Sequence, residues 1–137
     1  KATTETHLNA AQSLLEAVGT VVRLKSENQI DAVTGVSGSG PAYVFHLIEC
    51  LAAAGEAQGL APELAMQLAK ATVAGAGALA IASSETPSQL RVNVTSPNGT
   101  TQAGLDELMD SARGLPPLIR RTVAAATNRS KELARDA

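Results

Sequence analysis

Residues 71–82 read A-T-V-A-G-A-G-A-L-A-I-A, without one charged side chain. Alanine is the strongest helix former, so we expect this stretch to end a helix that begins near Glu63. A helix that is apolar on all sides is buried on all sides. In a chain of 137 residues, this predicts a place in the middle of a bundle or at an interface between subunits. Gly75 and Gly77 each cost about 1 kcal/mol relative to alanine in a helix interior, and close backbone contact is the expected compensation.

The composition extends the helical prediction to the whole chain. Aromatic residues make up 1% of the sequence, so the core must consist of Leu, Ile, Val and Ala. We therefore predict an all-α helical bundle with one short N-terminal strand, residues 20–25, which read T-V-V-R-L-K. A lone strand cannot satisfy its own backbone, so we expect it to belong with a sheet that this sequence lacks.

The remaining helices are predicted from the spacing of apolar residues and from the positions of glycine and proline. They cover residues 6–18, 29–36, 41–58, 87–94 and 101–109, with a final helix that starts near residue 116. Residues 95–100 are predicted to form a polar turn.

Charge, cysteine content and hydropathy exclude several partners. The net charge is −2 and the basic residues form no dense run, so no nucleic-acid partner is expected. Cys50 is the single cysteine, which excludes an internal disulfide and favours a cytoplasmic location. No uncharged stretch reaches the roughly 18 residues of a membrane helix, so we expect a soluble protein with no membrane partner. The first residue is Lys1 rather than Met, and we expect a piece of a longer protein.

The sequence lacks the familiar signatures of metal and nucleotide sites. His46 and Cys50 stand four residues apart, and one such pair is weak evidence, so no metal site is predicted. The residues around Ser37 and Ser39 do not supply Gly-x-Ser-x-Gly. No Gly-x-Gly-x-x-Gly follows a strand, so a nucleotide cofactor would have to be held by another domain.

Two polar loops are the candidates for chemistry. Residues 37–42, S-G-S-G-P-A, lead into a helix that Ser39 or Gly40 can cap, and a plain glycine-rich junction explains them better. Residues 95–101, T-S-P-N-G-T-T, contain Pro-Asn-Gly, a strong turn sequence. The helix that follows directs its N-terminal amides and several hydroxyls at one point. Such a point suits a small carboxylate, although a well-capped turn without a ligand explains the spacing equally well.

Three motifs resemble the pyrroline-5-carboxylate reductase family. They are D-A-V-T-G-V-S-G-S-G-P-A-Y-V-F at 31–45, V-T-S-P-N-G-T-T at 94–101 with A-G-L at 103–105, and A-T-N-R-S-K-E-L at 126–133. The resemblance covers the C-terminal half of that family. It implies that residues 1–26 are the tail of the family's Rossmann domain and residues 27–137 its helical dimerisation and substrate-binding domain.

The resemblance also implies an activity, a cofactor and a partner. The reaction is the last step of proline biosynthesis, in which a hydride passes from NADPH, or NADH in its place, to pyrroline-5-carboxylate. The cofactor would be held mainly by a domain that this sequence lacks, so the fragment alone is expected to be inactive. The partner is a second copy, in a homodimer or a higher homo-oligomer.

Site residues follow from the same resemblance. Ser96 and the amides of Gly99 and Thr100 would hold the substrate carboxylate. Thr101 would place its hydroxyl on the ring nitrogen as the catalytic residue, and Ser39 would lie near the nicotinamide of the cofactor. Asn98 departs from the family pattern, which usually has a glycine there.

Two alternatives remain at this point. One is the helical half of another dehydrogenase built from a Rossmann domain and a bundle. The other is a non-catalytic helical dimerisation module, which explains residues 71–82 equally well but leaves the loop at Ser96 without a purpose.

Overall fold

The computed structural model describes residues 3–135. Their contacts divide the chain into two compact units, Lys1–Ile30 and Asp31–Ala137. The boundary predicted from the sequence lies between residues 26 and 27, and the assignment of residues 1–26 to a Rossmann domain stays a prediction.

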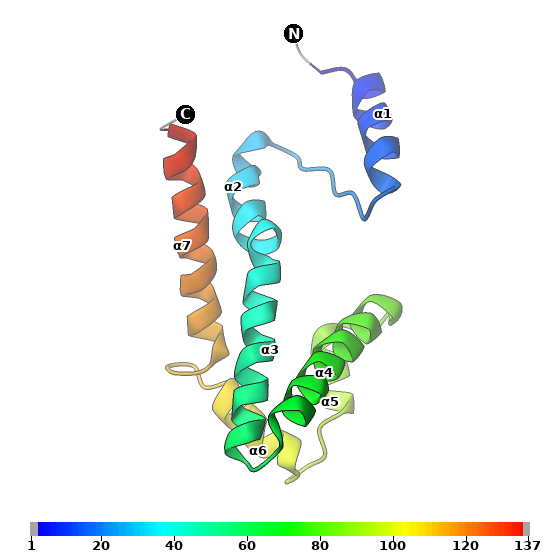
Figure 1. Ribbon diagram of the computed structural model, residues 1–137. Coiled ribbons are helices and arrows are strands. Elements are labelled where there is room, and N and C mark those ends of the chain that lie inside the picture. Colours follow the sequence, from blue (N-terminus) through cyan, green and yellow to red (C-terminus); the bar gives the residue numbers. More distant parts are fainter. Residues whose placement is uncertain (1–2, 136–137) are drawn as a thin grey trace. The chain divides into compact units, whose positions relative to one another are not determined.

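The described residues form helices joined by loops and contain no strand, which confirms the all-α prediction for this part of the chain. The elements are α1 (Glu5–Glu16), η1 (Glu27–Gln29), α2 (Ile30–Val33), η2 (Thr34–Gly38), α3 (Gly40–Ala57), α4 (Pro62–Ala82), α5 (Pro87–Asn93), α6 (Thr100–Leu108) and α7 (Leu115–Arg135) (Figure 1). The region predicted as one helix at 29–36 divides among a 3-10 turn, a short α-helix and a π-helical turn.

In the first unit, the strand predicted at residues 20–25 does not form in this chain. A strand needs a neighbour that exchanges backbone hydrogen bonds with it, and none is present among the described residues. Arg23 holds this segment to α1 instead. Its Nε donates to Gln12 Oε1 at 2.6 Å, and its Nη1 donates to Glu5 Oε1 at 2.6 Å.

In the second unit, η2 packs tightly against α7. Gly35 is buried, and a Cβ added there would lie 3.1 Å from the carbonyl oxygen of Val123 and closer still to Thr127 Oγ1. One turn further along α7, the Ser130 hydroxyl donates to Asp31 Oδ1 at 2.7 Å. These contacts fix the start of α3 against α7.

The core between α3 and α4 is small. Its buried side chains are Ala52, Ala65 and Ala69, with Ile48 and Met66 packed against them. Small side chains let the two helices approach closely, but they bury little apolar area, and burial stabilises in proportion to that area. Most of the larger apolar side chains of this unit therefore stay exposed.

Helix α4 is the clearest case of this exposure. Leu64, Leu68 and Leu79 share one face and are 44%, 47% and 50% exposed. A Cβ added at Gly75 or at Gly77 would meet nothing within 4 Å. The interpretation of residues 71–82 as the core of a single chain is therefore wrong, because no described segment covers this part of α4. The interpretation as a surface between subunits remains.

By length and composition alone, α4 could cross a membrane. Glu63 and Lys70 interrupt the helix, so it contains no uncharged stretch of the length expected for a membrane helix. A single such helix is weak evidence, because the core helix of a soluble protein passes the same test.

The turn between α6 and α7 is held by Asp110. Its Oδ1 accepts hydrogen bonds from the backbone N–H of Arg113 at 2.7 Å and of Ala112 at 2.8 Å. These bonds favour the ionised carboxylate and lower the pKa of Asp110. The stabilisation is present above the ordinary pKa of an aspartate and is lost as the pH falls through the lowered value.

Replacing Gly114 with alanine should destabilise this turn. The added Cβ would lie 2.5 Å from the Leu108 carbonyl oxygen and 2.6 Å from that of Asp110, so the backbone must shift. Overpacking of this kind costs about 1–3 kcal/mol. Thermal and urea denaturation should show the loss, whereas Gly19→Ala, with nothing within 4 Å, should leave the free energy of unfolding unchanged. Equal stability of the two variants would contradict the steric argument.

Candidate functional site

A tight turn at Ser96–Gly99 connects α5 to α6. The Gly99 N–H donates to the Ser96 carbonyl oxygen at 3.0 Å, Pro97 takes the second position, and Asn98 has a φ of 59°. A positive φ at the third position is the mark of a type II turn, and asparagine tolerates it better than most residues. The departure from the family pattern at Asn98 is thus accommodated by the backbone.

Gly99 packs against Ser96, the first residue of this turn. A Cβ at Gly99 would lie 3.1 Å from the Ser96 carbonyl oxygen and 3.3 Å from Ser96 Cβ. Any larger residue there would press on Ser96. The N–H of Gly99 is also committed to the turn, so in this conformation it is not free to bind a carboxylate.

The N-terminus of α6 is left open by its glycine cap. Hydroxyls of Thr4 and Thr86 cap α1 and α5, whereas Gly99 has no side chain with which to cap α6. The first bond within α6 runs from the Ala103 N–H to the Gly99 carbonyl oxygen at 3.2 Å. The amides of residues 100–102 therefore have no acceptor inside the helix and form a place where an anion can bind.

Residues with hydroxyl groups precede or carry these free amides in the sequence. Ser96, Thr100 and Thr101 are all exposed, and none of their hydroxyls has a hydrogen-bond partner within residues 3–135. Residues 95–101 contain no titratable side chain. The loop can therefore bind a small carboxylate through neutral donors and can offer one more hydroxyl to a polar atom beside that carboxylate.

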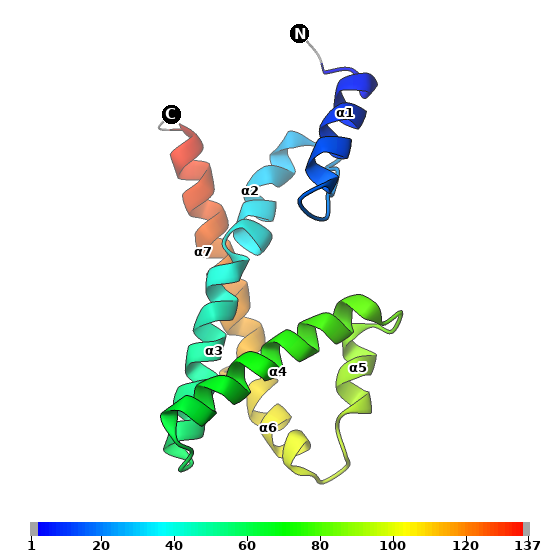
Figure 2. The same ribbon diagram turned by 45° about the vertical axis from the view of Figure 1, so that its right-hand side comes forward.

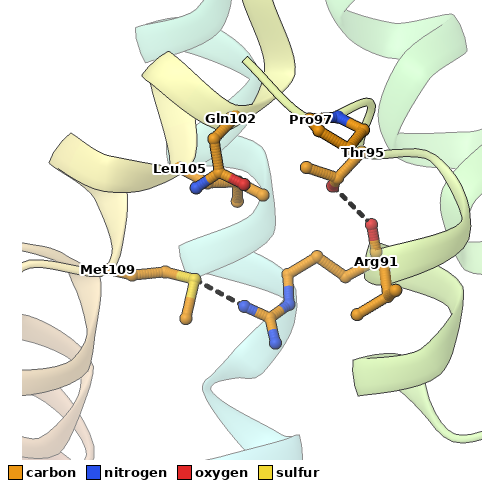
Figure 3. Close-up of a pocket in the computed structure, with 7 residues that line it drawn as sticks. Arg91, Thr95, Pro97, Gln102, Leu105 and Met109 are labelled. Atoms are coloured by element: carbon orange, nitrogen blue, oxygen red, sulfur yellow. Dashed lines mark hydrogen bonds between the residues drawn. The ribbon is translucent and has the colours of Figure 1, made fainter. Parts of the chain in front are cut away.

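A cavity of about 320 Å³ lies behind the loop, between α5 and α6 (Figure 3). Its lining includes Arg91, Thr95, Gln102, Leu105 and Met109. The Thr95 hydroxyl donates to the Arg91 carbonyl oxygen at 2.6 Å, and the Arg91 guanidinium reaches across to Met109 Sδ. The sequence analysis missed Arg91 and Thr95, although a threonine four residues after a helical residue is a recognisable spacing for such a bond.

Ser39 does not join this group within one chain. It is half-buried, precedes α3, and makes no capping bond with its side chain. Both views place the start of α3 at the opposite end of that helix from α6 (Figures 1 and 2). The structure thus brings Ser96, Gly99, Thr100 and Thr101 together and leaves Ser39 apart.

The pair His46 and Cys50 forms an exposed chain of contacts on α3. His46 Nε2 lies 3.6 Å from Cys50 Sγ, and His46 Nδ1 lies 2.9 Å from Glu49 Oε2. No group of three His, Cys, Asp or Glu side chains within residues 3–135 is arranged to hold a metal ion.

Residues 27–133 match the family described as pyrroline-5-carboxylate reductase dimerisation. The chain belongs to this family. The match confirms the resemblance and excludes the alternative of a different Rossmann-plus-bundle dehydrogenase. The loop at Ser96 and the exposed α4 both lie inside the matched residues.

Relatives of the pyrroline-5-carboxylate reductase family are similar over most of this chain. The Pseudomonas aeruginosa pyrroline-5-carboxylate reductase is 48% identical over 124 residues, which are 90% of this chain and 45% of the relative. The Pisum sativum enzyme is 43% identical over 132 residues, 96% of this chain and 47% of the relative. The chain therefore spans about half the length of the relatives that it matches.

Solved structures agree with this family assignment. A Coxiella burnetii pyrroline-5-carboxylate reductase superposes with a TM-score of 0.89 at 40% identity, over 96% of this chain and 48% of that one. The Plasmodium falciparum pyrroline carboxylate reductase with NADP bound gives a TM-score of 0.82 at 31% identity, over 96% and 49% of the two chains.

Proposed function

We propose that this chain is the dimerisation and substrate-binding half of a reductase that converts 1-pyrroline-5-carboxylate to L-proline. The observation that carries the proposal is the uncapped N-terminus of α6 beside the hydroxyls of Ser96 and Thr101. A helix N-terminus with neutral donors can hold the carboxylate of a small imino acid without a basic side chain. The names of the relatives supply the substrate.

In this proposal the substrate carboxylate binds the Ser96 hydroxyl and the amides of Thr100 and Thr101. Gly99 shapes the turn and does not bind the carboxylate itself, because its N–H already donates to the Ser96 carbonyl oxygen. The helix dipole adds to the attraction, because the positive end of α6 faces the bound anion.

Thr101 is the proposed catalytic residue. Its hydroxyl is assigned to the ring nitrogen, where it can share a hydrogen bond as the charge on that nitrogen changes. No side chain of residues 95–101 can act as an acid. The proton that the nitrogen needs therefore comes from outside the loop, from the substrate as it binds or from water.

NADPH, or NADH in its place, supplies the hydride when bound. Within residues 3–135 there is no strand and no glycine-rich strand-to-helix turn that could cradle a dinucleotide. The only contact that we assign to this chain is Ser39, whose hydroxyl at the uncapped start of α3 could meet the nicotinamide amide. The phosphates and the adenosine would be held by another domain.

A second copy of the chain is the proposed partner. The leucine face of α4 is exposed, and a close helix contact with a second copy would cover it and explain its glycines. Ser39 directly precedes α3, and the start of α3 lies at the end of that helix away from α6 (Figures 1 and 2), so we infer that a site using both Ser39 and the Ser96 loop draws them from two copies. We propose a homodimer or a higher homo-oligomer in the cytoplasm.

The isolated chain should be a dimer without reductase activity. Sedimentation at micromolar concentration should give the mass of two chains, and NADPH oxidation with pyrroline-5-carboxylate should be absent. The full-length protein should oxidise NADPH with that substrate. A folded monomer would contradict the dimer. An inactive full-length dimer would contradict the reductase and favour the non-catalytic dimerisation module.

A further inference from the structure

The turn that carries the substrate donors borders a cavity of about 320 Å³. Thr95 and Pro97 line this cavity from the loop, and Val92, Leu105 and Met109 line it from the helices on either side (Figure 3). Segments with few buried apolar contacts open easily, so hydrogen bonds to a neighbouring helix help to keep such a loop in place.

Thr95 supplies those bonds from the end of α5. Its N–H donates to the Val92 carbonyl oxygen at 3.0 Å, and its half-buried hydroxyl donates to the Arg91 carbonyl oxygen at 2.6 Å. The hydroxyl thereby satisfies a carbonyl that the helix terminus would otherwise leave free. The next residue along the chain is Ser96, so the same bond fixes where the turn begins.

We propose that Thr95 is a positioning residue of the substrate loop. It touches neither substrate nor cofactor, and it acts by tying Ser96 and the free amides of α6 to the last turn of α5. This inference deepens the proposed function and rests on it. Only the hydroxyl is needed, so serine can replace threonine and valine cannot.

Steady-state kinetics of the full-length reductase test the role. Thr95→Val should raise KM for pyrroline-5-carboxylate roughly threefold to tenfold, the loss expected for one hydrogen bond. The value of kcat and the KM for NADPH should stay within about twofold, because the loop still forms and the cofactor lies elsewhere. Thr95→Ser should restore the normal KM.

A matched control lies on α7. The Thr122 hydroxyl donates to the Leu118 carbonyl oxygen at 3.0 Å, the same bond to the fourth preceding residue, but away from the loop. Thr122→Val should leave the substrate KM unchanged. If Thr95→Val behaves like Thr122→Val, or if serine fails to restore the KM, Thr95 has no positioning role.

Hydrogen exchange separates this inference from the proposed function. The amides of residues 95–101 should exchange several-fold faster in Thr95→Val than in the wild type, with no change in Thr122→Val. If the wild-type enzyme lacks reductase activity, the proposed function fails. If hydrogen exchange at residues 95–101 is unchanged in Thr95→Val, the positioning role of Thr95 is overturned, whatever the activity. Should the valine variant fail to fold, Thr95→Ala can be compared with Thr95→Ser instead. Equal KM values and equal exchange rates in those two variants would overturn the positioning role of Thr95.

Discussion

Thr101→Val in the full-length reductase should lower kcat by roughly 5- to 150-fold. Valine keeps the branched shape and removes the one hydroxyl that we assign to the substrate nitrogen. A hydrogen bond lost from a reacting group is worth about 1–3 kcal/mol, and each 1.36 kcal/mol is a factor of ten in rate. Thr101 is exposed at the start of α6, so the melting temperature should not change. Turnover measured with saturating NADPH and substrate decides the prediction.

Ser96→Ala is the matched comparison for this effect. Its proposed partner is the carboxylate, which is present in the ground state and the transition state alike. Loss of such uniform binding raises KM and leaves kcat nearly unchanged. Normal turnover in Thr101→Val, together with a loss of turnover in Ser96→Ala, would mean that the two roles are assigned wrongly.

Gly75→Leu should convert the dimer of this chain to a monomer that keeps its helices. Gly75 lies on the same face of α4 as Leu64, Leu68 and Leu79, and nothing in its own chain lies within 4 Å of an added Cβ. A leucine there meets no obstacle in the monomer but overpacks a close contact with a second copy. Overpacking costs about 1–3 kcal/mol, and a symmetric interface contains the substitution twice. Sedimentation over a dilution series should show dissociation at concentrations at least about tenfold higher than for the wild type.

Gly77→Leu provides the control on the same helix. Gly77 comes seven residues after Lys70 and fourteen after Glu63, so it shares its face with two charged side chains. The effect of this substitution on dissociation should be the smaller of the two. Circular dichroism should show unchanged helix content for both variants. A Gly75→Leu protein that remains dimeric would place the interface on another surface.

Local features of the site could be predicted from the sequence because they depend on residues close together in the chain. Pro97 and Asn98 predicted the turn, and the helix that follows was expected at residues 101–109. The exposed threonines at its start followed from the same spacing. The commitment of the Gly99 N–H could not be foreseen, because it depends on the actual backbone angles of the turn.

Two expectations about the fold depend on neighbours that are not among the described residues. Residues 20–25 have the composition of a strand, but a strand forms only where a neighbour accepts its hydrogen bonds, and here Arg23 ties this segment to α1 instead. Residues 71–82 were expected to be enclosed in a bundle or at an interface between subunits, and because that part of α4 is mostly exposed in the single chain, only the interface remains. Both cases concern what lies next to a segment, which its own residues do not specify.

The sequence by itself determined the helical class and the turn at Ser96–Gly99, because propensity and turn chemistry act over a few residues, and its three motifs identified the family. Only the tertiary structure decided which surfaces are covered and which groups meet. It put the start of α3, which Ser39 precedes, at the end of that helix away from α6 (Figure 1), left the leucine face of α4 open and joined Thr95 to Arg91 beside a cavity. Burial depends on segments distant in sequence, and their arrangement follows from packing of the whole chain rather than from any one stretch of it.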